Sequence, residues 1–300
     1  MINRILVPLD GSFLAESVLP VAAYLAKKIN VSITFIHIIE KDAPEKIHGQ
    51  KHLTAAAQAM DYLQKIADLD IFRGINVEIH VHESSVKDVS RSIADHSEEL
   101  SQDLVLMCTH GSSGIHDLLF GSIAQQVIAH GNTPVLLINP ENKSINEKFN
   151  FENMIVPLDG NPEHEQALEY ASWLAKLCDA RLKLLMAIPH FGNLSGEWTS
   201  ANRFLPGTTT RMMDMFVSDA KEYLDKLQSD LEKSGLEVTT CACRMEPANA
   251  IIEMADAISA DLIIIGTHGK AGTEAFWAGS ITPKISRLSK VPLLLIPVKK

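Results

Sequence analysis

Short apolar runs alternate with longer amphipathic segments along the first half of the chain. Runs rich in Ile, Val and Leu predict strands at residues 4–10, 32–39, 75–82, 103–109 and 134–139. Apolar positions at helical spacing predict helices at residues 14–29, 53–69, 86–100 and 121–131. Apolar strands joined by helices are typical of a parallel sheet covered on both faces. The pattern therefore predicts an α/β fold with five parallel strands and right-handed crossovers.

The second half of the chain repeats the first. The run that starts at Arg4 matches the run that starts at Asn153 without a gap, and Val156 corresponds to Val7, an offset of 156 − 7 = 149 residues. Pro292 corresponds to Pro134, an offset of 292 − 134 = 158, so the second copy has nine extra residues. We expect two tandem domains, 1–142 and 151–300, joined by the polar stretch 140–152. The insertion at 189–215 is either a connecting loop or a lid.

The predicted fourth strand of the second copy runs into a glycine-rich segment, IIIGTHGKAGTEAFWAGSIT, at 263–282. Gly266 and Gly269 would let backbone N–H groups converge, and Gly279, Ser280 and Thr282 would begin a helix with its positive end and two hydroxyls. The spacing predicts a phosphate site that is neither a P-loop nor a dinucleotide fingerprint. The alternative is a set of turn glycines and a helix cap. If the first and fourth strands are neighbours, Asp159 and this segment share one edge of the sheet.

These residues resemble the universal stress protein family in its tandem form, over nearly the whole chain. Gly266, Gly269, Gly279 and Ser280 match the family's G-x2-G-x9-G-[ST] motif, and Asp159 in VPLD matches its aspartate after the first strand. The resemblance implies two Rossmann-like domains of the adenine nucleotide alpha-hydrolase type that bind ATP, with AMP or ADP as alternatives and Mg²⁺ as an accompanying ion. It implies nucleotide contacts from Pro157, Asp159, Ala187, Gly266, His268, Gly269, Gly279, Ser280, Ile281 and Thr282.

The first copy departs from the motif at two positions. Cys108 stands where Gly266 stands in the second copy, and Ala124 replaces Thr282. Asp10, Gly111, Gly121 and Ser122 are kept, so they form a second candidate nucleotide site. Losing one hydrogen bond to a charged phosphate costs about 1.5–3 kcal/mol, or about one to two decades of affinity. We expect the second copy to bind the nucleotide more tightly.

Composition narrows the range of partners. The formal net charge of −10 argues against nucleic acid, and no apolar run reaches the roughly 20 residues that span a membrane. Four cysteines and a start without an apolar signal core predict a cytoplasmic protein. We interpret Cys241 and Cys243 as buried structural thiols. The histidines of the groups 47–52 and 80–82 are interpreted as surface residues.

Three functions remain open. The first is a nucleotide-binding regulatory module read by a protein partner. Its two domains would form an intramolecular pseudo-dimer through strands 135–139 and 293–298, as the family does, and two chains would form a homodimer. The second is slow ATP hydrolysis or phosphoryl transfer, although no catalytic base is identified. The third is a ligand-free scaffold. His110 and His268 are interpreted as loop residues and not as catalysts.

Overall fold

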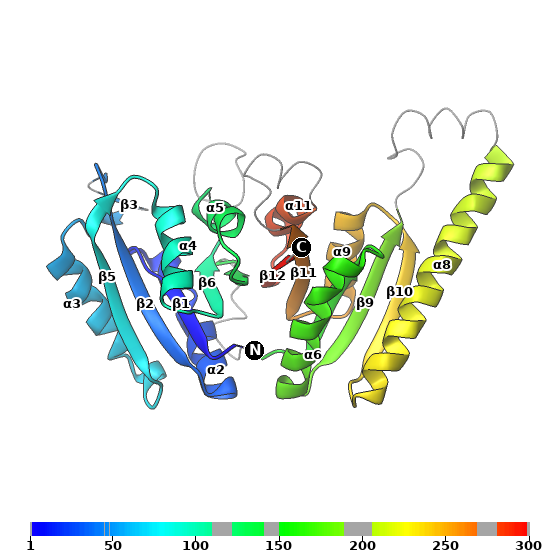
Figure 1. Ribbon diagram of the computed structural model, residues 1–300, viewed down its shortest axis with the longest axis horizontal. Coiled ribbons are helices and arrows are strands. Elements are labelled where there is room, and N and C mark those ends of the chain that lie inside the picture. Colours follow the sequence, from blue (N-terminus) through cyan, green and yellow to red (C-terminus); the bar gives the residue numbers. More distant parts are fainter. Residues whose placement is uncertain are drawn as a thin grey trace. The chain divides into compact units, whose positions relative to one another are not determined.

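The computed structural model describes residues 2–44, 46–47, 49–109, 122–140, 150–188, 206–268 and 281–298. The chain forms two compact units, drawn in Figure 1. The first unit contains Met1–Asn150 and Thr267–Lys300, and the second contains Phe151–Gly266. Within the described residues, no helix is both long and apolar enough to cross a membrane.

The sheet of the first unit contains the five predicted parallel strands in the order β5-β2-β1-β6-β7. Their bounds are β1 Arg4–Pro8, β2 Ser32–Glu40, β5 Val77–Val86, β6 Leu104–Cys108 and β7 Val135–Ile138. The central strands β1, β2, β6 and β7 are almost entirely buried, which explains their continuous apolar sequences. The structure thus confirms the α/β class and the position of the first strand beside the fourth.

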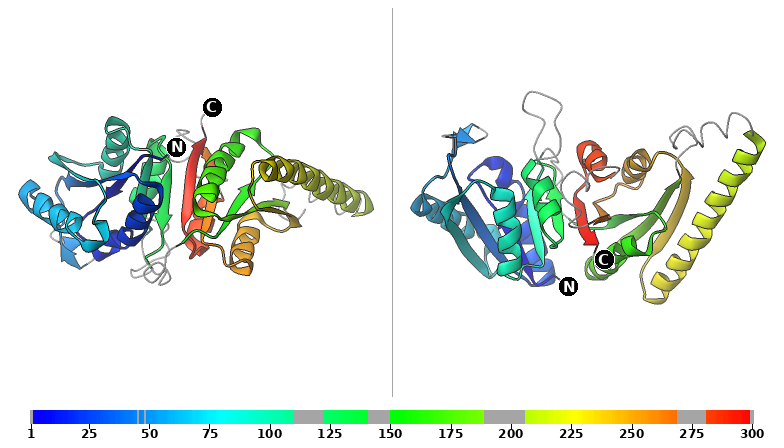
Figure 2. Two further views of the ribbon diagram at one scale, coloured as in Figure 1. Left: turned by 90° about the horizontal axis from the view of Figure 1, so that it is seen from below. Right: turned by 45° about the horizontal axis from the view of Figure 1, so that its top comes forward.

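Helices cover both faces of this sheet (Figures 1 and 2). Two of them, α2 (Leu19–Ile29) and α3 (Ala56–Ala67), lie on one face. The other face carries α4 (Val89–Glu99) and α5 (Ser122–His130), which pack against each other. Asn30 ends α2 in the left-handed conformation, with φ 54°. Asp179 ends the corresponding helix of the second copy in the same way, with φ 56°.

The second unit repeats this arrangement with parallel strands in the order β10-β9-β8-β11. Their bounds are β8 Asn153–Leu158, β9 Arg181–Ile188, β10 Val238–Arg244 and β11 Leu262–His268. One face carries α6 (Gln166–Cys178) and α8 (Pro206–Lys233), and α9 (Pro247–Ala257) lies on the other (Figure 2). The one-turn 3-10 helix η3 (Pro162–Glu165) precedes α6.

Equivalent aspartates fasten the start of the first strand in both copies. The Asp103 carboxylate accepts hydrogen bonds from the backbone N–H groups of Asn3 and Arg4, at 2.7 and 3.1 Å. The Asp261 carboxylate accepts the same pair of bonds from Glu152 and Asn153, both at 2.9 Å. Each aspartate lies just before the fourth strand of its copy, so it joins two neighbouring strands at their amino ends.

Strand β12 (Leu293–Val298), which follows the short helix α11 (Thr282–Leu288), pairs antiparallel with β7. Leu293 lies opposite Leu137 and Leu295 lies opposite Val135. Both strands are fully buried, so their apolar sequences are matched by their environment. The predicted pairing of strands 135–139 and 293–298 is therefore confirmed.

Three local features differ from what the sequence pattern predicted or were not predicted by it. The helix predicted at 14–29 is two helices, α1 (Phe13–Glu16) and α2, because Pro20 has no N–H to donate and therefore fits the first turn of a new helix. The two-residue strands β3 (Lys46–Ile47) and β4 (Gln50–Lys51) form a hairpin that the periodicity did not predict. The last part of the insertion at 189–215 is helical, since α8 begins at Pro206; residues 189–205 lie outside the described residues.

Candidate functional site

The first strand of each copy ends in an Asp-Gly turn. The Asp10 carboxylate accepts a hydrogen bond from the N–H of Ser12 at 2.8 Å, and the Asp159 carboxylate accepts one from the N–H of Asn161 at 3.0 Å. The glycines of these turns, Gly11 and Gly160, have φ values of +87° and +80°. A residue with a Cβ is strained at such angles. The turn therefore holds the aspartate at the carboxyl edge of the sheet in both copies.

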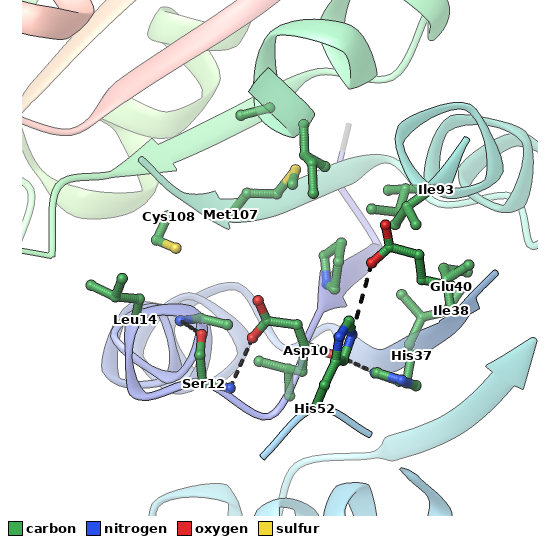
Figure 3. A pocket seen from close by; sticks show the side chains of 17 residues that line it. Asp10, Ser12, Leu14, His37, Ile38, Glu40, His52, Ile93, Met107 and Cys108 are labelled. Atoms are coloured by element: carbon green, nitrogen blue, oxygen red, sulfur yellow. Dashed lines mark hydrogen bonds and ion pairs between the residues drawn. The ribbon is translucent and has the colours of Figure 1, made fainter. Parts of the chain in front are cut away.

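A cavity of about 120 Å³ lies next to this turn in the first unit (Figure 3). Most of its wall is apolar and comes from β1, β2, α4, β6 and α5. The wall also carries polar or titratable side chains, namely Asp10, Ser12, His37, Glu40, His52 and Cys108. Its described lining residues therefore include two carboxylates but neither Lys nor Arg.

His37 joins three segments around this cavity. It is only 2% exposed, its Nδ1 lies 2.7 Å from the carbonyl oxygen of Leu9, and its Nε2 lies 2.9 Å from that of Leu53. Gln50 fastens the same segment, because its side-chain oxygen accepts a hydrogen bond from the N–H of Phe13 at 2.7 Å. Residues 50–53 are thus held over the Asp-Gly turn. Sequence analysis missed His37, which stands inside an otherwise apolar strand.

Cys108 lies in the wall of the cavity, at the position where the second copy has Gly266. Burial, and secondly the negative charge of Asp10, raise the pKa of the Cys108 thiol to about 12. The thiol is therefore protonated at neutral pH and acts as a small apolar group. Ala124 also lines the cavity. It stands where the second copy has Thr282, so the first copy lacks the hydroxyl predicted there.

Gly266 lies where β11 runs parallel to β8 in the second unit. A Cβ built on Gly266 would lie 3.0 Å from the backbone oxygen of His164 and 3.2 Å from its Cα. The close approach of η3 therefore favours glycine here, whatever the ligand. The sequence motif predicted that Gly266 contacts a nucleotide. It did not predict that Gly266 packs closely against η3.

His164 connects Gly266 to Asp159. Its Nδ1 lies 2.7 Å from Oδ2 of Asp159, and its side chain is 13% exposed. The hydrogen bond to Asp159 raises the pKa of His164, against the opposing effect of burial. Burial acts to raise the pKa of Asp159, but the hydrogen bonds from His164 and Asn161 outweigh it and lower this pKa. Sequence analysis did not identify His164; the only signal was a histidine five residues after the VPLD aspartate.

The structure describes some of the residues that the sequence predicts to contact a nucleotide. Pro157 lies in β8 opposite Leu185 of β9, and Ala187 lies two residues further along β9. Thr282 is buried at the start of α11, directly after Ile281, and His268 is the last residue of β11. In the first copy, Ser122 begins α5. The remaining predicted contacts lie outside the described residues, which exclude 110–121 and 269–280. They are Gly111, Gly121, Gly269, Gly279 and Ser280, and His110 lies in the first of these gaps.

The interpretation of His52 as a surface residue was wrong. His52 is buried, not exposed, and its Nδ1 lies 3.2 Å from the carbonyl oxygen of Pro44. His80 and His82 are half-buried, and their rings contact the buried ring of His96 at centroid distances of 5.0 and 4.8 Å. These ring contacts join the side chains of β5 to that of α4.

The thiols of Cys241 and Cys243 are free and partly exposed instead of buried. Burial, followed by the neighbouring Cys241, raises the pKa of Cys243. Among the described residues, no group of three or more His, Cys, Asp or Glu side chains is arranged to hold a metal ion.

The chain belongs to the universal stress protein family, whose model matches residues 1–139 and 150–297. The universal stress protein YxiE of Bacillus subtilis is 30% identical over 150 residues, which cover 49% of this chain and 99% of that protein. A universal stress protein of Mycolicibacterium smegmatis is 22% identical over 308 residues, which cover 97% of this chain and 96% of that one.

Solved structures show the same fold. The crystal structure of a universal stress protein from Archaeoglobus fulgidus has a TM-score of 0.72 at 20% sequence identity, and the match covers 99% of both chains. The functionally unknown protein PA1789 from Pseudomonas aeruginosa has a TM-score of 0.65 at 15% identity, covering 99% of this chain and 93% of that one. The two-domain architecture is therefore shared along the whole length.

Proposed function

We propose that this universal stress protein binds an adenine nucleotide, held mainly by the second copy, and acts as a regulatory module in a stress response. One observation carries the proposal. The aspartate after the first strand and the first glycine of the motif meet through His164, at the carboxyl ends of neighbouring parallel strands. Ligands of open α/β sheets bind at this edge. ATP is the expected ligand, AMP and ADP are the alternatives, and Mg²⁺ would accompany the phosphates.

The composition of the first-unit cavity supports the second copy as the main site. Its wall contains the carboxylates of Asp10 and Glu40 and no described Lys or Arg, which disfavours a triphosphate. Cys108 adds a thiol where the motif has glycine, and Ala124 supplies no hydroxyl. We expect nucleotide affinity in the first copy to be lower by about one to two decades for each lost phosphate hydrogen bond.

The regulatory role follows from linkage. A ligand that binds one arrangement of the protein stabilises it by RT ln(1 + [L]/Kd), about 2.7 kcal/mol at a hundredfold excess over Kd. We infer that a protein partner in the cytoplasm responds to the nucleotide-bound arrangement, and that the chain forms a homodimer. Slow hydrolysis remains the enzyme alternative, and a scaffold without ligand remains the structural one.

The test is mass spectrometry of the nucleotide released from the purified protein, counted per chain. We expect about one adenine nucleotide per wild-type chain and none from the Gly279→Asp variant. Two per chain would mean that the first copy also binds, in spite of Cys108. No nucleotide, with no uptake of added ATP, would refute the proposal. ADP as the main species released after incubation with ATP would favour the enzyme alternative.

A further inference from the structure

The Asp159–His164 pair is present only in the second copy. The residue that corresponds to His164 in the first copy is Ala15, since 164 − 149 = 15. Asp10 keeps the turn hydrogen bond from Ser12 that Asp159 receives from Asn161. The turn therefore needs no histidine to form, and His164 adds something beyond the backbone geometry.

The position of His164 restricts the Asp159 carboxylate. Asn161 donates to Oδ1 and the imidazole donates to Oδ2, so both carboxylate oxygens have a fixed partner. The backbone of His164 lies close to Gly266, because a Cβ added at Gly266 would be only 3.0 Å from the backbone oxygen of His164. The His164 ring is therefore attached to backbone that lies beside β11. This contact ties the orientation of the carboxylate to the first glycine of the motif.

Carboxylates lie near His164 on two elements. Asp159 faces it from the end of β8, and Glu163 lies beside it on η3. Glu165, also on η3, accepts a hydrogen bond from Tyr223 of α8 at 2.9 Å. The hydrogen bond that His164 donates to Asp159, followed by the negative charges of Asp159 and Glu163, favours the protonated imidazole and keeps the pKa of His164 above its ordinary value. When His164 is protonated the pair has no net charge, and when it is neutral the pair is negative.

We propose that His164 is a positioning residue of the nucleotide site in the second copy and makes its affinity for a phosphorylated ligand dependent on pH; this inference rests on the proposed function. A neutral Asp159–His164 pair does not repel the phosphates, whereas a negative pair does. One charge at a distance of several ångströms near a protein surface changes affinity roughly threefold to tenfold, and less at high salt. Affinity for ATP should therefore fall as pH rises through the titration of His164, and affinity for uncharged adenosine should not.

The experiment measures binding of ATP and of adenosine to the full chain by calorimetry between about pH 6.5 and 9. His164→Asn keeps a donor near the position of Nδ1 but cannot carry a charge, and His164→Ala copies the first unit. His80→Gln removes a histidine from the first unit and serves as the matched control. Protonation of ATP itself affects every variant equally, so the measured quantity is the difference in slope between each variant and the wild type.

We expect the wild type and His80→Gln to lose ATP affinity roughly threefold to tenfold more than His164→Asn as the pH rises. His164→Ala should bind both ligands more weakly than His164→Asn at every pH, because the carboxylate loses its donor. Equal slopes in the wild type and His164→Asn, with binding still abolished by Gly279→Asp, would overturn this inference alone. No ATP binding at any pH, or binding unaffected by Gly279→Asp, would overturn both the inference and the proposed function.

Discussion

Replacing Gly266 with Ala tests the close contact between β11 and η3. The new Cβ would lie 3.0 Å from the backbone oxygen of His164 and 3.2 Å from its Cα, so backbone must move by a few tenths of an ångström. Overpacking of this kind costs about 1–3 kcal/mol. The φ of Gly266 lies outside the left-handed region, so Ala also stabilises by about 0.4–1 kcal/mol through the unfolded chain. We expect a net loss of about 0.5–2 kcal/mol, or roughly 1–8 °C in Tm.

Tryptophan fluorescence during urea unfolding is the suitable assay. All three tryptophans, Trp173, Trp198 and Trp277, belong to the second copy, and Trp173 lies on α6 of the second unit. Gly207→Ala on α8 is the matched control, because its Cβ meets nothing within 4 Å and Ala favours the helix. His164→Ala should not rescue Gly266→Ala, since the nearest atoms are backbone. A Gly266→Ala protein as stable as the wild type, or rescued by His164→Ala, would refute the reasoning.

Two further predictions concern stability. Burial and the neighbouring His96 and His82 lower the pKa of His80, so its stabilising contribution is complete above about pH 6.5 and is lost as the pH falls. His80→Gln should flatten the decline of Tm between about pH 7 and 5, and an unchanged decline would contradict this assignment. Asp261→Ala leaves two backbone N–H groups without their acceptor and should lower the free energy of unfolding by about 1.5–3 kcal/mol in the urea titration. A loss below about 0.5 kcal/mol would mean that water replaces the carboxylate at little cost.

Much of the fold could be predicted because the same pattern occurs twice. Continuous apolar strands identified the parallel sheet, and the ungapped match from Arg4 and Asn153 identified the duplication. The interruptions of this regular pattern of helices and strands were harder to predict, because they depend on single residues and short turns that hydrophobic spacing does not indicate. Pro20 begins a new helix inside a continuous apolar pattern, and β3 and β4 are too short to show alternation.

The site was predictable only where a motif names residues. Asp159 and Gly266 could be placed at one sheet edge, since that required only the strand order. The contact that joins them could not be predicted, because His164 follows the strand in a one-turn helix without periodicity. His37 was hidden for the opposite reason: a polar residue in a buried strand resembles an exception to the pattern until its two carbonyl partners are known.

The antiparallel pairing of β12 with β7 has a consequence for synthesis. Leu137 meets Leu293, so 293 − 137 = 156 residues separate the two partners along the chain. At about 5–20 residues per second, roughly 8–30 s pass between the emergence of one partner and the other. During that interval the apolar edge of β7 lacks the strand that covers it in the finished protein, and exposed strand edges promote aggregation. The nascent first copy therefore depends on a strand, Leu293–Val298, that is translated much later, so a chain that terminates before this strand would leave the edge of β7 uncovered.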